Sequence, residues 1–203
     1  MGKYFGTDGF RGEANVDLTV EHAYKVGRFL GSYYSKDGKK CRVVIGKDTR
    51  RSSYMFEYSL VAGLTASGAD AYLLHVTTTP SVSYVVRSDD FDCGIMISAS
   101  HNPYYDNGIK VINGNGEKLE EEVIEKIESY IDGPDDAIAF ATKENIGRTV
   151  DYAAGRNRYI GYLISIATRS FKGKKVALDL ANGSASSIAK NVFDALGADT
   201  YVT

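Results

Sequence analysis

The sequence predicts an α/β fold, in which helices sandwich a mixed, mostly parallel sheet and the beginning of a similar second domain follows. Short apolar runs of strand length alternate along the chain with segments of helical periodicity. A helix separates two such runs, Arg42–Gly46 and Ala71–Leu74, which makes a strand–helix–strand unit with parallel strands and a right-handed crossover. A strand–helix–strand order recurs near residue 200, where the sequence of Gly197–Tyr201 resembles that of Gly68–Tyr72.

The first expected helix begins at Leu18–Glu21, where Thr19 can cap and Glu21 suits the first turn. Helical spacing gives it a core face made of Val20, Ala23, Val26, Leu30 and Tyr33. His22 falls off this face, so we expect an ordinary surface histidine.

Two further helices lie on either side of the second strand. Residues 54–67 carry Phe56, Leu60 and Leu64 inward and stop at Gly68. Residues 80–87 follow a run of threonines, with Thr79 as the expected cap and Pro80 at the first helical position.

The stretch 94–111 organises the rest of the chain. An apolar run, Ile95–Ile97, is a buried strand, and the polar residues 98–105 after it form what we call the central loop. Asp106–Gly108 is a second turn, and the chain is extended again over Ile109–Val111. This order brings Lys110 back towards Ser100 and His101.

An amphipathic helix is expected over 117–131, and the pattern breaks at 132–136. We place a domain boundary near residues 151–156, giving a first domain of 1–153 and an incomplete second domain of 154–203. The second contains helix 156–170, strand 175–180, helix 185–196 and strand 199–202.

The composition is that of a globular protein, with 203 residues of which 43% are hydrophobic and 25% charged. A net charge of −2 argues against a nucleic-acid partner, which usually needs a basic face. No signal segment or apolar run of ~18 residues is seen, so no membrane association is expected. Cys41 and Cys93 begin apolar strands and are expected to be buried thiols, which suits the cytoplasm.

The central loop combines a hydroxyl, an imidazole and, through Lys110, an ammonium group. Together these groups can perform phosphoryl or acyl transfer, although a solvated Asn-Pro loop would explain them equally on composition alone. The glycine-rich N-terminus frames Thr7, Asp8 and Arg11, and arginine is a forked donor suited to phosphate oxygens. Asp48, Arg50 and Arg51 follow the carboxyl end of a strand, which makes them plausible neighbours of a site. The alternative, which we favour, is that Asp48 and Arg50 pair and brace the loop over 47–53.

Three motifs carry a family resemblance. Ser98–Pro103 (SASHNP), Tyr105–Lys110 (YDNGIK) and Tyr4–Gly12 (YFGTDGFRG) resemble the phosphoserine loop and the opening signature of the α-D-phosphohexomutases. Within that family the wording is most similar to the bacterial branch that acts on glucosamine phosphates. The resemblance implies that the first domain has the fold predicted above.

The resemblance also implies roles for particular residues. Ser100 would carry a phosphoryl group and exchange it with a phosphorylated hexosamine, so that glucosamine 6-phosphate and glucosamine 1-phosphate interconvert through a 1,6-bisphosphate, a step towards cell-wall precursors. Arg11, His101 and Lys110 would share the catalysis, and Thr7, Arg11, Asn102 and Lys110 would bind phosphate. Mg²⁺ would bind through the phosphate on Ser100, with its other ligands beyond residue 203.

Members of this family have four domains, so the chain is expected to be an N-terminal fragment that is inactive alone. Three alternatives stay open: a phosphomannomutase/phosphoglucomutase, a non-catalytic phosphosugar-binding module, and a serine hydrolase with Ser100 as nucleophile and His101 as base. The sequence leaves open the oligomeric state and whether Lys110 or His101 moves the hydroxyl proton.

Overall fold

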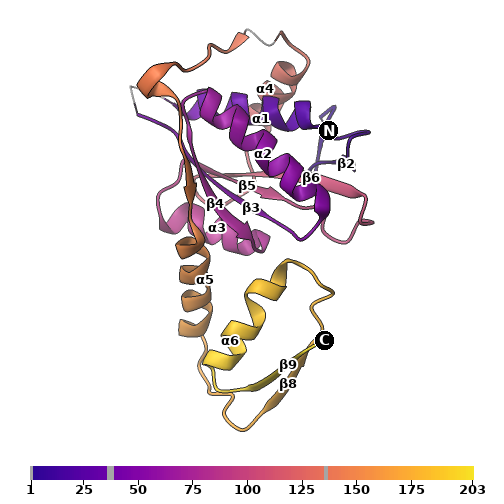
Figure 1. The fold of residues 1–203 in the computed structure, drawn as a ribbon, viewed down its shortest axis with the longest axis vertical. Coiled ribbons are helices and arrows are strands. Elements are labelled where there is room, and N and C mark those ends of the chain that lie inside the picture. Colours follow the sequence, from indigo (N-terminus) through magenta and orange to yellow (C-terminus); the bar gives the residue numbers. More distant parts are fainter. Residues whose placement is uncertain (1, 36–38, 135–136) are drawn as a thin grey trace.

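The computed structural model describes residues 2–35, 39–134 and 137–203. A seven-stranded sheet in the order β1-β2-β6-β5-β3-β4-β7 forms the larger body, and β8 and β9 form a separate two-stranded sheet. Figure 1 shows the larger body above, with α5 descending to the smaller unit that carries the C-terminus. The predicted α/β architecture is therefore confirmed. The expected break at 132–136 falls partly on residues 135–136, outside the described residues.

The strands of the large sheet are β1 (Phe5–Gly6), β2 (Gly9–Glu13), β3 (Arg42–Lys47), β4 (Asp70–Val76), β5 (Cys93–Ile97), β6 (Asp106–Asn113) and β7 (Thr149–Asp151). Its helices are α1 (Val20–Tyr34), α2 (Arg51–Ala66), α3 (Thr79–Ser88) and α4 (Glu121–Ile131), with a short 3-10 turn at Lys143–Asn145. The connecting helix is α5 (Ala153–Ser165), and the smaller unit contains β8 (Lys175–Leu178), a 3-10 turn at Ser184–Ser187, α6 (Ala189–Ala195) and β9 (Asp199–Val202).

Strand direction decides where a site can form. β3 pairs in parallel with both β4 and β5, and β7 adds in parallel to β4. β6 returns antiparallel beside β5, and β2 pairs antiparallel with β6, so β2 again runs in the main direction. The carboxyl ends of β3, β4 and β5 consequently meet at one edge of the sheet, where open α/β sheets bind ligands.

Two apolar cores cover the two faces of this sheet. On one face α1, α2 and α4 lie over alternate strand residues, among them Val43, Ile45 and Ile95, which are all fully buried. On the other face α3 packs Val82, Val85 and Val86 against Val44 and Met96, and α5 contacts both α3 and β4. The alternation of strand side chains between faces produces this division.

The first turn of α1 confirms the predicted cap and corrects two other predictions. The Thr19 side chain accepts a hydrogen bond from the His22 amide, and His22 Nδ1 accepts one from the Thr19 amide, so the two residues form a capping box. His22 is half-buried against the rings of Tyr4 and Phe10 and is therefore not an ordinary surface histidine. Val20 is 42% exposed and lies outside the core.

Some helix ends also differ from the expected ones. The N-cap of α3 is Thr78, without a side-chain cap hydrogen bond, and Thr79 is already helical. The helix α2 begins at Arg51, three residues early. The predicted turn at Asp106–Gly108 is wrong, because all three residues belong to β6. The predicted helix over 185–196 is divided at Ile188, where the backbone leaves helical geometry.

The similar sequences at 68–72 and 197–201 adopt similar local structure. Gly68 ends the connection from α2 to β4 with φ +86°, and Gly197 ends that from α6 to β9 with φ +91°. Glycine adopts this left-handed conformation at no steric cost, and the strand begins two residues later in both cases. β8 and β9 are parallel, as the predicted strand–helix–strand unit requires.

The glycine contact between α1 and α2 gives a stability prediction. A Cβ at Gly63 would lie 2.2 Å from the Tyr24 carbonyl oxygen, a backbone atom that cannot move aside. We expect Gly63→Ala to lower the free energy of unfolding by about 1–3 kcal/mol through overpacking, as measured by urea denaturation. The control is Gly161→Ala in α5, where a Cβ meets nothing within 4 Å and the helix should gain roughly 0.5–1 kcal/mol. Equal stability of the two variants would contradict this account.

The structure also bears on membrane-spanning helices and on the two cysteines. Within the described ranges, no helix is both long and apolar enough to cross a membrane. Cys41 and Cys93 are free, buried thiols, as predicted, and burial raises the pKa of both.

Candidate active site

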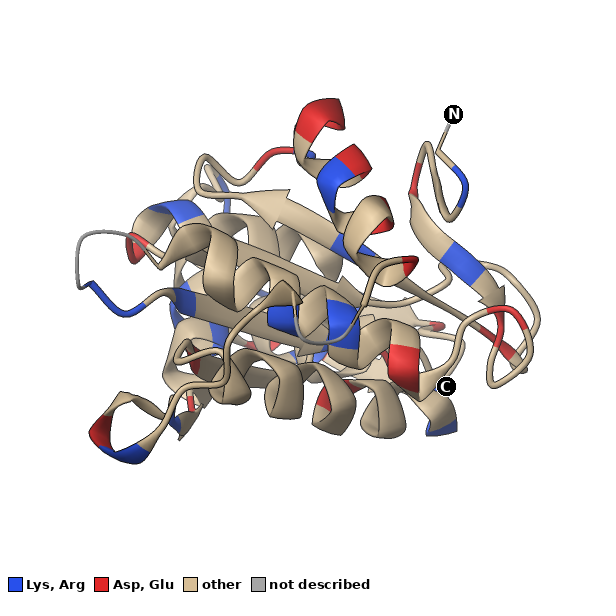
Figure 2. Ribbon diagram, turned by 90° about the horizontal axis from the view of Figure 1, so that it is seen from above, with Lys and Arg blue, Asp and Glu red and all other residues tan. Residues whose placement is uncertain are grey.

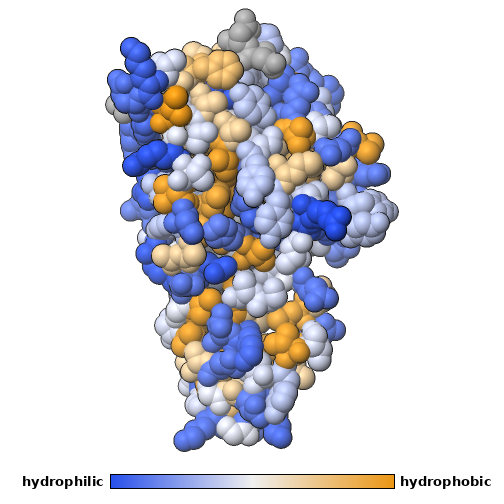
Figure 3. All heavy atoms as spheres, in the orientation of Figure 1, coloured by the Kyte–Doolittle hydropathy of each residue, from blue (hydrophilic) through white to orange (hydrophobic). Residues whose placement is uncertain are grey.

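A cleft of about 860 Å³ opens at the carboxyl edge of β3, β4 and β5. The loops that follow these three strands contribute its walls, and the loop after β8 closes it from the smaller unit. Figure 3 shows the surface hollowed where the upper body meets the lower unit. The polar residues that line it include Thr49, Arg51, Ser100, His101, Asn102, Lys110, Asn182 and Ser184.

Ser100 is exposed on the central loop, just beyond β5. Its φ of 57° lies in the left-handed region, which is costly for a residue with a Cβ by about 1–3 kcal/mol. Its amide donates to Ser98 Oγ at 3.1 Å, and the Asn102 amide donates to the Ala99 carbonyl. The loop is thus held in a strained conformation that presents a primary hydroxyl to the cleft.

His101 and Asn102 occupy different positions on the loop. His101 is exposed, and its Nδ1 lies 3.4 Å from Ser100 Oγ. Asn102 turns back into the loop, where its side-chain amide donates to Asp106 Oδ2 at 2.9 Å. His101 is consequently placed to exchange a proton with the hydroxyl, whereas Asn102 stabilises the loop itself.

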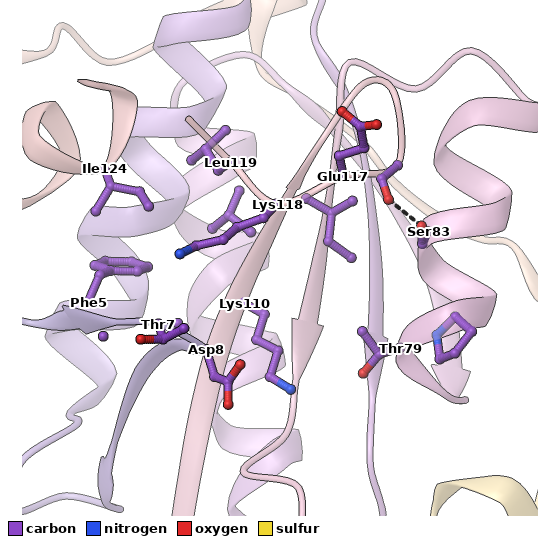
Figure 4. Close-up of a pocket in the computed structure, with 16 residues that line it drawn as sticks. Phe5, Thr7, Asp8, Thr79, Ser83, Lys110, Glu117, Lys118, Leu119 and Ile124 are labelled. Carbon is purple, nitrogen blue, oxygen red and sulfur yellow. Dashed lines mark hydrogen bonds between the residues drawn. The ribbon is translucent and has the colours of Figure 1, made fainter. Parts of the chain in front are cut away.

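Lys110 and Arg11 project from the same face of adjacent strands. Arg11 on β2 pairs with Gly108 on β6, and Lys110 lies two residues further along β6. Lys110 pairs with Met96 and faces the α3 side of the sheet, where it lines the cleft together with Ser100. In Figure 4 the Lys110 side chain extends towards Asp8 and Thr79. Ser100, His101 and Lys110 therefore line the same cleft.

Burial lowers the pKa of Lys110, and the nearby positive charge of Arg11 lowers it further. The carboxylates of Asp8 and Asp48 act in the opposite direction. No hydrogen bond joins the ammonium to any acceptor among the described residues, so its donors are available to a ligand in the cleft.

Thr7 and Arg11 line a separate hollow and not the cleft that Ser100 borders. Arg11 donates to Asp8 Oδ2 at 3.1 Å, while its Nε is buried without a hydrogen-bond partner. Thr7 also borders a groove of about 490 Å³, lined mainly by apolar side chains, to which Lys110 contributes too. Among the predicted site residues, Lys110 therefore borders both the groove and the cleft.

Arg50 differs from its expected role. It pairs with Asp48, as predicted, with Nε 2.9 Å from Asp48 Oδ2. Its guanidinium, however, reaches across to carbonyl oxygens of the central loop instead of bracing only its own loop. The position of Arg50 after a strand indicated a plausible neighbour of the site, but not which loop it would contact.

Electrostatics favour an anion in the cleft. The N-terminal ends of α2 and α3 both border it through Arg51 and Thr79, and helix N-termini carry partial positive charge. His101 and Lys110 add further donors. The surface outside the cleft is mixed in charge, and Figure 2 shows Lys and Arg interspersed with Asp and Glu over the elements seen from above. The attraction for anions is therefore local to the cleft.

Comparison with known proteins identifies relatives of the whole chain. Residues 2–137 match the family model for phosphoglucomutase/phosphomannomutase, alpha/beta/alpha domain I. A phosphoglucosamine mutase of Lachnoclostridium phytofermentans is 79% identical over 202 residues, which cover 100% of this chain and 45% of that protein. The phosphoglucosamine mutase of Bacillus subtilis is 48% identical, with coverage of 98% and 44%. The chain thus spans under half the length of these relatives.

Solved structures show the same fold. A putative phosphomannomutase from Thermus thermophilus superposes with a TM-score of 0.77 at 26% identity, covering 98% of this chain and 44% of that one. A phosphoglucomutase/phosphomannomutase family protein from Burkholderia thailandensis gives a TM-score of 0.80 at 22% identity, with coverage of 98% and 43%. At these levels of identity the second comparison speaks for the fold alone.

Proposed function

Because the chain belongs to the phosphoglucomutase/phosphomannomutase family, we propose that it is the N-terminal part of a phosphoglucosamine mutase. Such an enzyme interconverts glucosamine 6-phosphate and glucosamine 1-phosphate, which serves amino-sugar nucleotide and cell-wall precursor synthesis. The observation that carries the proposal is Ser100, an exposed hydroxyl on a strained loop that borders a cation-lined cleft. The relatives named phosphoglucosamine mutase support this substrate over mannose or glucose phosphates.

The proposed chemistry is a relay of one phosphoryl group through Ser100. The phosphoserine gives its phosphoryl group to the free hydroxyl of a hexosamine monophosphate: the Oγ–P bond breaks, a sugar O–P bond forms, and the proton of the sugar hydroxyl passes to Ser100 Oγ. The resulting 1,6-bisphosphate turns around and returns its other phosphoryl group to Ser100. Negative charge spreads over the oxygens in transfer, so the cations around the cleft stabilise this state.

Each predicted site residue has a proposed part in that relay. Lys110 and Arg11 offer N–H donors to phosphate oxygens, and Thr7 adds a hydroxyl at the adjoining hollow. His101, 3.4 Å from Ser100 Oγ, and Lys110 are the two candidates for moving the hydroxyl proton. Asn102 acts through the loop, because its amide is engaged by Asp106.

The test is direct phosphorylation of the chain by glucose 1,6-bisphosphate. We expect intact-mass spectrometry to show the gain of one phosphoryl group, and peptide mapping to locate it on Ser100. We also expect no interconversion of glucosamine phosphates by these residues alone in a coupled assay, since the distal phosphate contacts are proposed to lie elsewhere in the full-length protein. Absence of the mass gain, or its location on another residue, would overturn the proposal.

Mg²⁺ is part of the proposal only through the family resemblance. The cation takes oxygen ligands in near-octahedral geometry, usually from carboxylates, phosphate and water. The part of the chain that the structure describes contains no group of three His, Cys, Asp or Glu residues that could hold a metal. Two carboxylates beside the central loop are already engaged, Asp48 by Arg50 and Asp106 by Asn102. These residues do not form a magnesium site by themselves, and no step above depends on one.

The alternatives find less support. A serine hydrolase needs an acid that orients the histidine, and no carboxylate of the described residues hydrogen-bonds His101. Labelling by a fluorophosphonate probe would favour that alternative. A phosphosugar-binding module without chemistry would bind glucose 1,6-bisphosphate and gain no phosphoryl group, which the mass measurement distinguishes.

Three further points belong to the same proposal. We propose that residues 1–153 form the first domain, since β7 completes the large sheet and α5 begins at Ala153. Residues 154–203 would then open the second domain. A cytoplasmic location is proposed from the buried free thiols and the metabolic role, with a phosphorylated hexosamine as partner.

A further inference from the structure

The guanidinium of Arg50 contacts the backbone of the central loop at several points. Its Nη2 donates to the carbonyl oxygens of Ser100 at 3.0 Å and Asn102 at 2.9 Å. Its Nη1 donates to those of Pro103 and Asp106, the latter at 3.1 Å. One side chain therefore holds both arms of the loop, from the residue with the reactive hydroxyl to the first residue of β6.

Asp48 orients this guanidinium. Its Oδ2 accepts from Arg50 Nε at 2.9 Å, while its Oδ1 accepts from the Arg50 amide and from Ser53 Oγ at 2.6 Å. The side-chain amide of Asn107 donates a hydrogen bond to Ser53 Oγ at 2.9 Å. Because Asp48 follows β3 and Asn107 lies in β6, this network connects the loop after β3 with β6.

The contacts exhaust the guanidinium. Arginine has five N–H donors, one on Nε and two on each Nη. Nε donates to Asp48, and the four Nη protons are accounted for by the four loop carbonyls. The Arg50 side chain is only 11% exposed. It has no donor left for a phosphate oxygen, in contrast to Arg11, whose Nε is buried without a partner.

The strain at Ser100 makes such contacts necessary. A non-glycine residue at φ 57° persists only when its surroundings hold it there. Within the loop, the amides of Ser100, Asn102 and Asp106 form short-range hydrogen bonds, the last of them to the Pro103 carbonyl. Among the described residues, the Ser100 and Asn102 carbonyls accept no backbone hydrogen bond, and both accept from Arg50. Lysine carries the same charge but has three donors on one atom and cannot span four carbonyls.

We propose that Arg50 is a positioning residue: it fixes the central loop so that the Ser100 hydroxyl is presented for phosphoryl transfer, without touching the phosphate. This inference rests on the proposed function for its consequence in catalysis. Its structural part, that Arg50 holds the loop, can be measured separately. The two are tested by different readouts on the same variants.

The variants are Arg50→Lys, which keeps the charge, and Arg50→Gln, which removes it. We expect amide hydrogen exchange at Ser100, Asn102 and Asp106 to become about tenfold faster or more in both, because several hydrogen bonds are lost. The matched control is Arg148→Lys, whose arginine pairs with Asp70 at the opposite edge of the sheet and is 74% exposed. In Arg148→Lys, the amides of the central loop should exchange at the same rate as in the unchanged chain.

The second readout separates positioning from charge. We expect phosphorylation of Ser100 by glucose 1,6-bisphosphate to slow by about tenfold or more in both Arg50 variants, while the Kd for inorganic phosphate changes by less than about threefold. Full rescue of the rate by Arg50→Lys, or loop exchange that matches the unchanged chain, would overturn the inference. A loss of phosphate affinity in Arg50→Gln that Arg50→Lys restores would also overturn it, because Arg50 would then act on the phosphate.

Two provisions keep the test decisive. If an Arg50 variant unfolds, Asp48→Asn takes its place: it leaves the guanidinium but removes the carboxylate that orients it, and should also accelerate loop exchange. Exchange unchanged in Asp48→Asn would count against the inference. If the unchanged chain takes up no phosphoryl group, the proposed function fails, and the exchange comparison alone decides whether Arg50 holds the loop.

Discussion

Ser100→Ala is expected to abolish phosphoryl uptake from glucose 1,6-bisphosphate, with no residual mass gain over the time in which the unchanged chain is fully modified. The substitution removes the only atom of this residue that can accept the phosphoryl group. Because the side chain is exposed, the free energy of unfolding should change by less than about 0.5 kcal/mol. Intact-mass spectrometry and urea denaturation give the two readings.

The control for that variant is Ser88→Ala. Ser88 is also exposed, but it lies at the last turn of α3, away from the cleft, where its hydroxyl bonds only Asp89. We expect no phosphoryl group on Ser88 in the unchanged chain. In Ser88→Ala, Ser100 should take up its phosphoryl group at the same rate as in the unchanged chain. Persistent uptake by Ser100→Ala would show that another nucleophile carries the chemistry and would remove the basis of the relay.

Lys110→Met should slow phosphorylation of Ser100 by a factor on the order of 10² or more, since both charge stabilisation and a candidate proton carrier are lost. Methionine keeps the unbranched shape of the side chain and removes its charge. The rate of uptake, followed by quenched mass spectrometry, measures the effect. The half-buried position of Lys110 on β6 should keep the fold intact, because the lysine makes no hydrogen bond within the described residues.

The pH dependence gives this prediction a sign. Desolvation and the charge of Arg11 lower the pKa of Lys110 below the ordinary 10.5. If the ammonium form stabilises the phosphoryl group, the rate falls as pH rises through this lowered pKa, at lower pH than for an exposed lysine. The alkaline fall should vanish in Lys110→Met. A rate that instead rises over this range would assign Lys110 as the base that takes the hydroxyl proton.

Lys118→Met is the matched control for Lys110. Lys118 is exposed and does not line the cleft. It lines the adjoining groove, where Figure 4 shows it extending towards Phe5 and Thr7. Its loss removes the same charge from the same region without touching the cleft that Ser100 borders. A tenfold or greater loss of rate (about 1.4 kcal/mol) in Lys118→Met would show that the effect at Lys110 is one of general charge.

The sequence by itself determined strands β3 to β6, β8 and β9, most helices and the residues of the central loop, whereas β1, β2 and β7 were not among the predicted strands. Apolar runs such as Val43–Ile45 and Ile95–Ile97 are fully buried strands in the structure, since such runs are too apolar to face water. Helix ends were less certain. Thr78 rather than Thr79 precedes α3, and α2 starts at Arg51, because neighbouring threonines and serines offer competing start signals and packing selects between them.

Only the tertiary structure decided which side chains meet. Strand order places β2 beside β6 and so puts Arg11 near Lys110, although the two residues lie about 100 positions apart and no local pattern encodes their proximity. The tertiary structure also shows that Arg50 contacts the central loop, whereas the interpretation favoured from the sequence was that it braces its own loop. Periodicity reports which face of an element is apolar, whereas the partners of a polar side chain depend on how the elements pack.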